Sequence, residues 1–88
     1  MKNKKGMTVT ADEFAHMSRV EQNAFLRRCI VDEVADRTEE NAISISLIMY
    51  YQGLYRLGVS NQRITQLARG LLIRRKVLRL ACGLYYCP

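Results

Sequence analysis

The second half of this chain lacks acidic residues. Residues 45–88 carry seven Lys and Arg side chains and no Asp or Glu, whereas residues 1–44 carry seven basic and eight acidic ones. Surface helices normally mix both signs of charge, because opposite charges one turn apart attract each other. An acid-free half therefore indicates a polyanionic partner, most simply nucleic acid. An acidic protein surface or an anionic membrane surface is the alternative.

The chain also has no long apolar run and no Cys-x-x-Cys pair. No stretch of about 18 apolar residues occurs, which argues against a membrane-spanning helix. The cysteines Cys29, Cys82 and Cys87 are odd in number, and the basic start of the chain is not followed by the apolar stretch of a signal peptide. We therefore expect a cytoplasmic protein with reduced thiols. The cysteines lack the paired spacing of zinc sites, so we expect no metal and no other cofactor.

Residues with catalytic potential are few. His16 is the only histidine, and no serine or cysteine stands in evident register with it. Asp32, Glu33 and Asp36 have the spacing of a carboxylate pair, but a solvated helix face explains them. No glycine-rich phosphate loop occurs. We therefore expect no enzyme activity, no catalytic residue and no small-molecule substrate.

The hydrophobic pattern predicts an all-α fold, a small and oligomeric bundle of four helices. We expect a flexible basic tail at residues 1–9 and a single helical domain at residues 10–88. Thr10 with Glu13 and Ser18 with Glu21 fit capping boxes, which start a short first helix and a second helix at about 19–37.

Two further helices are expected in the remainder of the chain. Thr38 can cap a third helix at about 39–57. A fourth helix is expected from Asn61 to about Ala81, with Gly83 at its end. The third helix is apolar on nearly all faces, although its Ile-Ser-Ile-Ser start also resembles a strand. A short chain has few elements to cover such a helix, so we expect an oligomer interface there at Ile45, Ile48, Met49 and Tyr51.

Residues 57–67 have the pattern of a helix-turn-helix. Gly58 can adopt the left-handed conformation of a tight turn, and Ser60 can cap the next helix. Val59, Ile64 and Leu67 are then expected to point inward. The polar side chains between them would face the DNA groove, and basic side chains before and after would contact phosphates. The predicted DNA-binding residues are Arg56, Ser60, Asn61, Gln62, Arg63, Thr65, Gln66, Arg69, Arg74, Arg75, Lys76 and Arg79.

One residue departs from the usual helix-turn-helix pattern. The position four residues before the turn glycine is normally small, so that the two helices approach closely, but here it is Leu54. An ordinary helical hairpin would also fit this segment.

Residues 54–62, Leu-Tyr-Arg-Leu-Gly-Val-Ser-Asn-Gln, resemble the Met-Phe-Arg-Leu-Gly-Ile-Asn-Glu-Glu stretch of the FlhD family, subunits of a bacterial flagellar transcriptional activator. That family also has a large apolar residue at the position of Leu54. The resemblance is partial and spans about residues 54–87, and this chain stops where FlhD continues. Its further matches are Thr65, Leu67-Ala68, Arg79-Leu80-Ala81 and, across a small gap, Cys87.

The resemblance implies the small subunit of a hetero-oligomeric activator that binds double-stranded DNA. Its partners would be a second copy of itself and a larger FlhC-like subunit, and similar pairs occur on mobile genetic elements. The alternative from the residues alone is a protein–protein interaction module, such as a small phage-type inhibitor or antirepressor that binds a regulator and not DNA. The apolar third helix and the apolar C-terminal tail fit either function.

Overall fold

The computed structural model describes residues 9–88, which are mostly helical, as predicted. Residues 1–8 of the predicted basic tail lie outside the described part, and Val9 packs partly buried against the core. The elements in chain order are α2 (Ala11–His16), α3 (Arg19–Val34), the 3-10 helix η1 (Glu39–Asn41), α4 (Ile45–Tyr51), the 3-10 helix η2 (Tyr55–Leu57), α5 (Asn61–Ile73), β1 (Leu78–Arg79) and β2 (Tyr85–Tyr86).

Helices α2 and α3 start at the two predicted capping boxes. The hydroxyl of Thr10 accepts the Glu13 N–H at 3.1 Å, and the Glu13 carboxylate accepts the Thr10 N–H at 3.0 Å. Ser18 and Glu21 exchange the same two bonds, at 3.1 and 2.9 Å. Each box satisfies backbone donors that the first helical turn leaves without partners, which fixes both start points locally.

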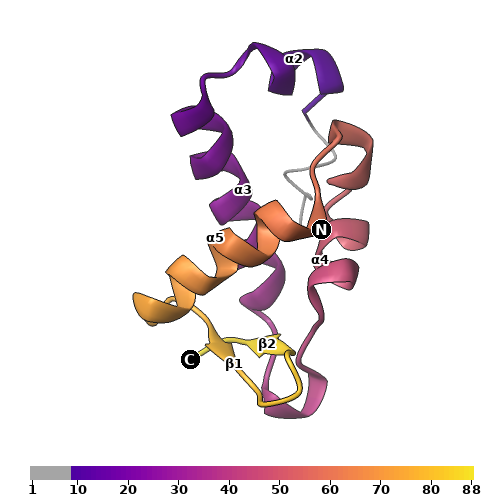
Figure 1. Ribbon diagram of the computed structural model, residues 1–88. Helices are drawn as coiled ribbons and strands as arrows, with labels where there is room; N and C mark the ends of the chain where they lie inside the picture. Colours follow the sequence, from indigo (N-terminus) through magenta and orange to yellow (C-terminus); the bar gives the residue numbers. More distant parts are fainter. Residues whose placement is uncertain (1–8) are drawn as a thin grey trace.

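The core forms where α3, α4 and α5 pack on one another in pairs. Figure 1 shows α5 lying across α3, with α4 on its other side and the β1–β2 hairpin below them. Apolar side chains at helical spacing fill the space between these elements. The fully buried ones are Leu26, Cys29, Ile30, Val34, Ile43, Ile48, Met49, Leu54, Ile64, Ala68 and Val77.

Helix α4 is much shorter than the predicted helix at 39–57. Ile43 exchanges two backbone hydrogen bonds of 2.8 Å with Tyr85, so the chain before α4 is extended and pairs with the C-terminal hairpin. At the other end Gly53 is left-handed, with φ 67°. The Gly53 N–H donates to the Tyr50 carbonyl at 3.1 Å and the Leu54 N–H to the Met49 carbonyl at 2.8 Å, the pattern of a Schellman motif that ends a helix.

Helix α5 ends at Ile73, eight residues before the predicted end, in a second Schellman motif. The Arg75 N–H donates to the Leu72 carbonyl at 3.0 Å and the Lys76 N–H to the Leu71 carbonyl at 2.9 Å. Arg75 takes the left-handed position, with φ 60°, where glycine is usual. The sequence contains no glycine at this point, so the helix end could not be predicted there.

The C-terminal tail forms an antiparallel hairpin, which an all-α prediction did not include. Leu78 pairs with Tyr86 and Arg79 with Tyr85, and Gly83 lies in the turn with φ 96°. Tyr85 is only 2% exposed. The apolar C-terminal tail therefore docks on its own chain.

A polar cluster is buried between α3 and α4. The Glu33 carboxylate accepts from Gln52 Nε2 at 2.9 Å and from Arg37 Nη2 at 3.1 Å. The interpretation of Glu33 as part of a solvated face is therefore wrong, because it lies on the core-facing side of α3 and is neutralised there by Arg37. None of the helices within residues 9–88 is long and apolar enough to cross a membrane.

Candidate nucleic-acid interface

The turn before α5 has the predicted cap and the predicted glycine. Gly58 has φ 76°, and the Ser60 hydroxyl accepts the Arg63 N–H at 3.1 Å. Val59 and Ile64 are buried on either side of this cap, in the N′ and N4 positions of a hydrophobic staple. The segment between α4 and α5 spans residues 52–60 and includes η2. It is longer than the turn of roughly 3–4 residues that joins the helices of most helix-turn-helix motifs.

Three predicted groove-facing residues lie together on the outer face of α5. Gln62, Gln66 and Arg69 are all exposed, and their spacing of four and three residues places them on one side of the helix. Ile64, Ala68 and Leu71 occupy the opposite side, in the core. We call Gln62, Gln66 and Arg69 the α5 face.

Arg63 is predicted to point outward, but its side chain lies against α3. Its Nη2 donates to Gln22 Oε1 at 3.0 Å and to Asn23 Oδ1 at 2.8 Å, and its guanidinium carbon lies 5.8 Å from the centre of the Phe14 ring. Burial, and then the positive charge of Arg19, lowers the pKa of Arg63. The side chain is long enough to cross from α5 to α3, which periodicity alone does not reveal.

Two other predicted groove residues make contacts within the protein. Asn61 Nδ2 donates to Ser46 Oγ at 3.2 Å, which ties the start of α5 to α4. The Thr65 hydroxyl donates to the Asn61 carbonyl at 2.8 Å, one turn back along the helix. Ser60 is used as the cap. The α5 face is therefore smaller than the predicted set.

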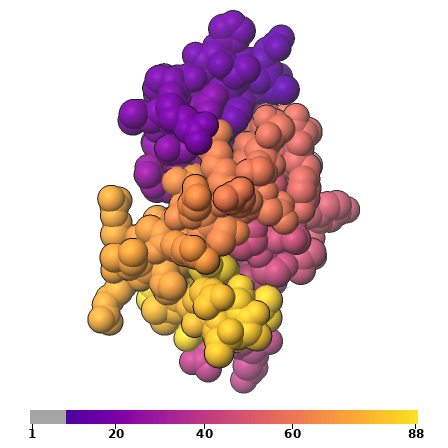
Figure 2. All heavy atoms as spheres, in the orientation of Figure 1, coloured from indigo at the N-terminus to yellow at the C-terminus, as the bar shows by residue number. Residues whose placement is uncertain are grey.

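The predicted phosphate-contacting residues are exposed but do not share one helix. Arg74, Arg75 and Lys76 form the turn that follows α5, which we call the basic turn. Arg56 lies in η2 and Arg79 on β1. Figure 2 shows the orange side chains of the end of α5 and its following turn projecting from one side of the molecule.

The fold adds basic residues from α3 that the sequence analysis missed. Lys76 lines a hollow of about 300 Å³ together with Arg27, Arg28 and the acidic Asp32 of α3. Arg19, the first residue of α3, lines another hollow beside the α5 face. These arginines lie in the half of the chain with balanced charge, so only the packing of α3 on α5 brings them to this surface.

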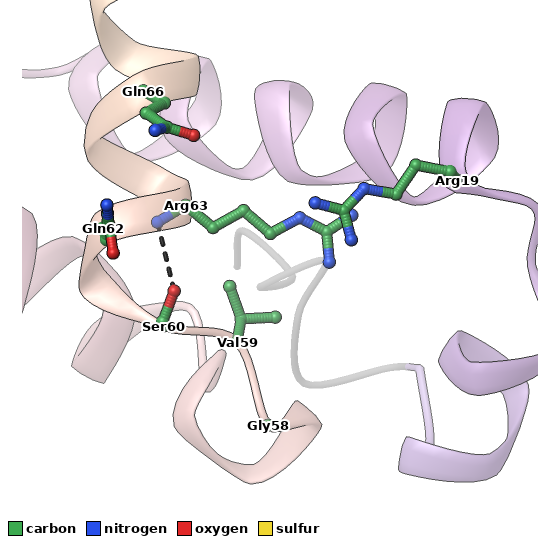
Figure 3. Close-up of a pocket in the computed structure, with 7 residues that line it drawn as sticks. All are labelled: Arg19, Gly58, Val59, Ser60, Gln62, Arg63 and Gln66. Atoms are coloured by element: carbon green, nitrogen blue, oxygen red, sulfur yellow. Dashed lines mark hydrogen bonds between the residues drawn. The ribbon is translucent and has the colours of Figure 1, made fainter.

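The hollow beside the start of α5 has a volume of about 380 Å³ and is shown in Figure 3. The arginine side chains come from two helices and extend toward each other, while the glutamines come from α5 alone. The lining residues are Arg19, Gly58, Val59, Ser60, Gln62, Arg63 and Gln66.

The predicted oligomer interface is wrong for two of its four residues. Ile48 and Met49 are fully buried in the core of their own chain, and Ile45 packs partly buried against that core. Short α4 packs against α3 and α5, so Ile48 and Met49 do not need a second subunit to cover them. Tyr51 is 40% exposed. The exposed apolar side chains of α4 and η2, which we call the α4–η2 surface, are Leu47, Tyr50, Tyr51 and Tyr55.

Comparison with protein-family models, with curated proteins and with solved structures gives no match.

The three cysteines and the histidine do not form a cluster. Cys29 is buried, Cys82 and Cys87 are exposed, and His16 Nδ1 lies 2.7 Å from the Asp12 carbonyl oxygen. Within residues 9–88, no three His, Cys, Asp or Glu side chains are placed to hold a metal ion.

Proposed function

We propose that this chain is a DNA-binding transcription regulator that presents the α5 face to the groove and the basic turn to phosphates. The observation that carries the proposal is the exposure of Gln62, Gln66 and Arg69 on one side of a capped helix. A glutamine amide can form two hydrogen bonds with the major-groove edge of adenine, and an arginine guanidinium can form two with that of guanine. The basic turn lies at the far end of the same helix and supplies charge without sequence preference.

The distribution of charge supports the same proposal. The acid-free half of the chain contains both α5 and the basic turn, so no carboxylate from residues 45–88 opposes an approaching polyanion. Arg19, Arg27 and Arg28 add positive charge from α3, which Asp32 in the hollow of Arg27 and Arg28 offsets in part. Arg79 lies on β1 in the hairpin, and we leave it out of the proposed contact surface.

Binding to duplex DNA measured against salt concentration tests this proposal. Neutralising about six phosphates lowers the affinity by roughly three orders of magnitude between about 50 and 200 mM salt. Gln62→Ala should relax the choice of sequence, whereas Arg74→Ala should weaken all sequences alike. Arg79→Ala serves as the matched control and should leave the affinity unchanged. Affinity that does not depend on salt would contradict the proposal.

We further propose that the chain acts as the small subunit of a hetero-oligomeric activator, with a larger FlhC-like partner. The resemblance of residues 54–87 to FlhD supports this, and so does the α4–η2 surface, where Tyr50 is 68% exposed and Tyr55 52%. Aromatic side chains of this kind are enriched in protein interfaces. Co-expression with the products of neighbouring genes, followed by a mobility shift on upstream DNA, tests for an activator pair.

The same apolar surface favours one alternative, an interaction module that binds a regulator and not DNA. In that case Tyr50→Asp should abolish the complex with the regulator, and substitutions on the α5 face should not affect it. A mobility shift separates the two functions. An activator subunit retards DNA more strongly together with its partner, whereas an antirepressor releases the regulator from DNA.

A further inference from the structure

The hollow beside the start of α5 brings two arginines together. Arg19 is the first residue of α3 and Arg63 the third residue of α5, and both line the hollow. Figure 3 shows the two guanidinium groups converging. No Asp or Glu is among the lining residues. Two like charges side by side are unfavourable unless an anion lies between or beside them.

The contacts of Arg63 hold its positive charge in place without neutralising it. Its Nη2 donates to the side-chain oxygens of Gln22 and Asn23, and both acceptors are neutral amides. Its Nε is buried and has no hydrogen-bond partner within the described structure. A buried donor without a partner is costly, so the protein's own contacts do not fully satisfy the Arg63 guanidinium.

The backbone around the hollow is also suited to an anion. Helix α5 has no acidic residue in its first turn, so its N-terminal partial positive charge is not offset from within the helix. Gln62 and Gln66 add neutral side-chain amides along one wall. At about 380 Å³, the hollow is wide enough for a phosphate group and the atoms attached to it.

We propose that this hollow is a phosphoanion site, in which Arg19 and Arg63 bind the phosphate oxygens from two sides. The fixed guanidinium of Arg63 is the inner contact, and exposed Arg19 closes over the anion from α3. The phosphate has two sources, the backbone of bound DNA or a free phosphorylated small molecule. The DNA source rests on the proposed function, whereas the anion site itself does not.

Titration of the ¹⁵N-labelled full chain with inorganic phosphate tests the site, with sodium chloride at equal ionic strength as the reference. We expect saturable shifts of the amide signals of Gly58, Gln62 and Gln66 with phosphate only. Arg19→Gln should weaken this binding by about tenfold, because it removes one charge-assisted contact. Arg19 is exposed, so the substitution leaves the core intact.

Arg79→Gln is the matched control, because it removes one exposed arginine from the hairpin, away from the hollow. It should leave the phosphate titration unchanged. Shifts that match those with chloride, or an unchanged affinity in Arg19→Gln, would overturn the site. Arg63→Gln gives a second test. It should also weaken phosphate binding, because glutamine lacks the positive charge of the Arg63 guanidinium even where the fold is kept.

A short DNA duplex added to the phosphate-bound protein separates the two sources. Displacement of phosphate by the duplex assigns the site to a DNA phosphate, and Arg19→Gln should then lower the slope of log affinity against log salt by about one. Duplex binding that leaves the phosphate titration unchanged assigns the site to a free phosphoanion. If no duplex binds at all, the proposed function fails and the anion site stands on its phosphate titration.

Discussion

Helices α3 and α5 start with the same serine cap and differ in the residues that follow it. In both helices the serine hydroxyl accepts the backbone N–H of the third helical residue at 3.1 Å. In α3 that residue is Glu21, whose carboxylate returns to the cap. In α5 it is Arg63, whose side chain leaves the helix and crosses to α3. The start of α3 therefore carries a carboxylate of its own, which bonds the Ser18 N–H. The start of α5 has no carboxylate, so an external anion can bind there.

The two helix starts also differ in how they are held. The residue before the α5 cap is Val59 and the fourth helical residue is Ile64, and both are buried. The corresponding residues of α3 are Met17 and Gln22, and Gln22 Nε2 donates to the Phe14 carbonyl at 2.9 Å. Helix α3 is thus fixed at its start mainly by local hydrogen bonds, whereas the start of α5 adds apolar packing in the core to its serine cap and its Asn61–Ser46 bond. This difference leaves the polar edge of α5 available to a partner.

The largest expected effect is on stability and comes from Ile64→Ala. Ile64 is fully buried, so its truncation should lower the free energy of unfolding by about 2–5 kcal/mol. The matched substitution at the fourth residue of α3, Gln22→Ala, removes hydrogen bonds of a half-buried amide and should cost about 1 kcal/mol. Urea denaturation followed by circular dichroism measures both. Equal losses would show that the two helix starts are held in the same way.

Arg63→Glu gives α5 the same third residue as α3 and should act mainly on binding. A glutamate there can close a capping box with Ser60, and it places a negative charge in the hollow. We expect duplex affinity to fall by about tenfold or more at ~0.1 M salt. The loss of the bonds to Gln22 and Asn23 should lower the free energy of unfolding by about 1–2 kcal/mol. Fluorescence anisotropy and urea denaturation measure the two effects.

Arg63→Gln is the control for this exchange, because it removes the positive charge without adding a negative one. Its duplex affinity should lie between those of the wild-type chain and Arg63→Glu. Wild-type duplex affinity in Arg63→Glu would rule out a DNA phosphate at the start of α5.

The parts of the fold that could be predicted from sequence are those fixed within about four residues of the chain. The boxes of Thr10 with Glu13 and of Ser18 with Glu21 are confirmed, as is the cap at Ser60. In each case the side chain bonds a backbone group one turn away, so residue type and spacing suffice.

The parts that could not be predicted depend on residues far apart in the chain. Ile43 pairs with Tyr85, which replaces the predicted start of the third helix by an extended bridge. The turn of Arg63 toward Gln22 and Asn23 spans about 40 residues and removes a predicted groove contact. Arginines of α3 join the candidate surface only through packing, so no pattern in their own half of the chain indicates it.

The C-terminal ends of α3 and α5 also differ, and a substitution there is expected to change stability by a smaller amount and in the opposite direction. Helix α3 ends at Val34 with a right-handed C-cap, Ala35, whereas the C-cap of α5, Arg74, is followed by a left-handed Arg75 with φ 60°. Arg75→Gly should raise the free energy of unfolding by about 1 kcal/mol, because glycine has no Cβ to clash in this conformation. The same change removes a charge from the basic turn and should weaken duplex binding.

Arg74→Gly is the matched control, because it removes the same charge at an ordinary φ of −81°. It should weaken duplex binding similarly but lower stability by about 0.5–1 kcal/mol, since glycine increases the freedom of the unfolded chain. Changes in stability of the same sign in both variants would show that Arg75 is not strained.

The smallest expected effect is on the pH dependence of stability. The Glu21 carboxylate gives such a dependence to the start of α3, and the start of α5 has no equivalent group. The backbone N–H of Ser18, and then its hydroxyl, hold the pKa of Glu21 below its usual value of 4.5. A lowered folded-state pKa means that this stabilisation is complete above the unfolded-state pKa and is lost as the pH falls through the folded-state pKa. Glu21→Gln keeps the hydrogen-bonding shape of the box but cannot ionise, so its stability should fall less than that of the wild-type chain between about pH 5 and 3. Urea midpoints across this range measure the difference. The change Gln62→Glu places a carboxylate at the second residue of α5 and should add an acid-sensitive component at the start of this helix, where none exists now. Parallel curves for all three proteins would mean that the two helix starts do not differ in their electrostatics.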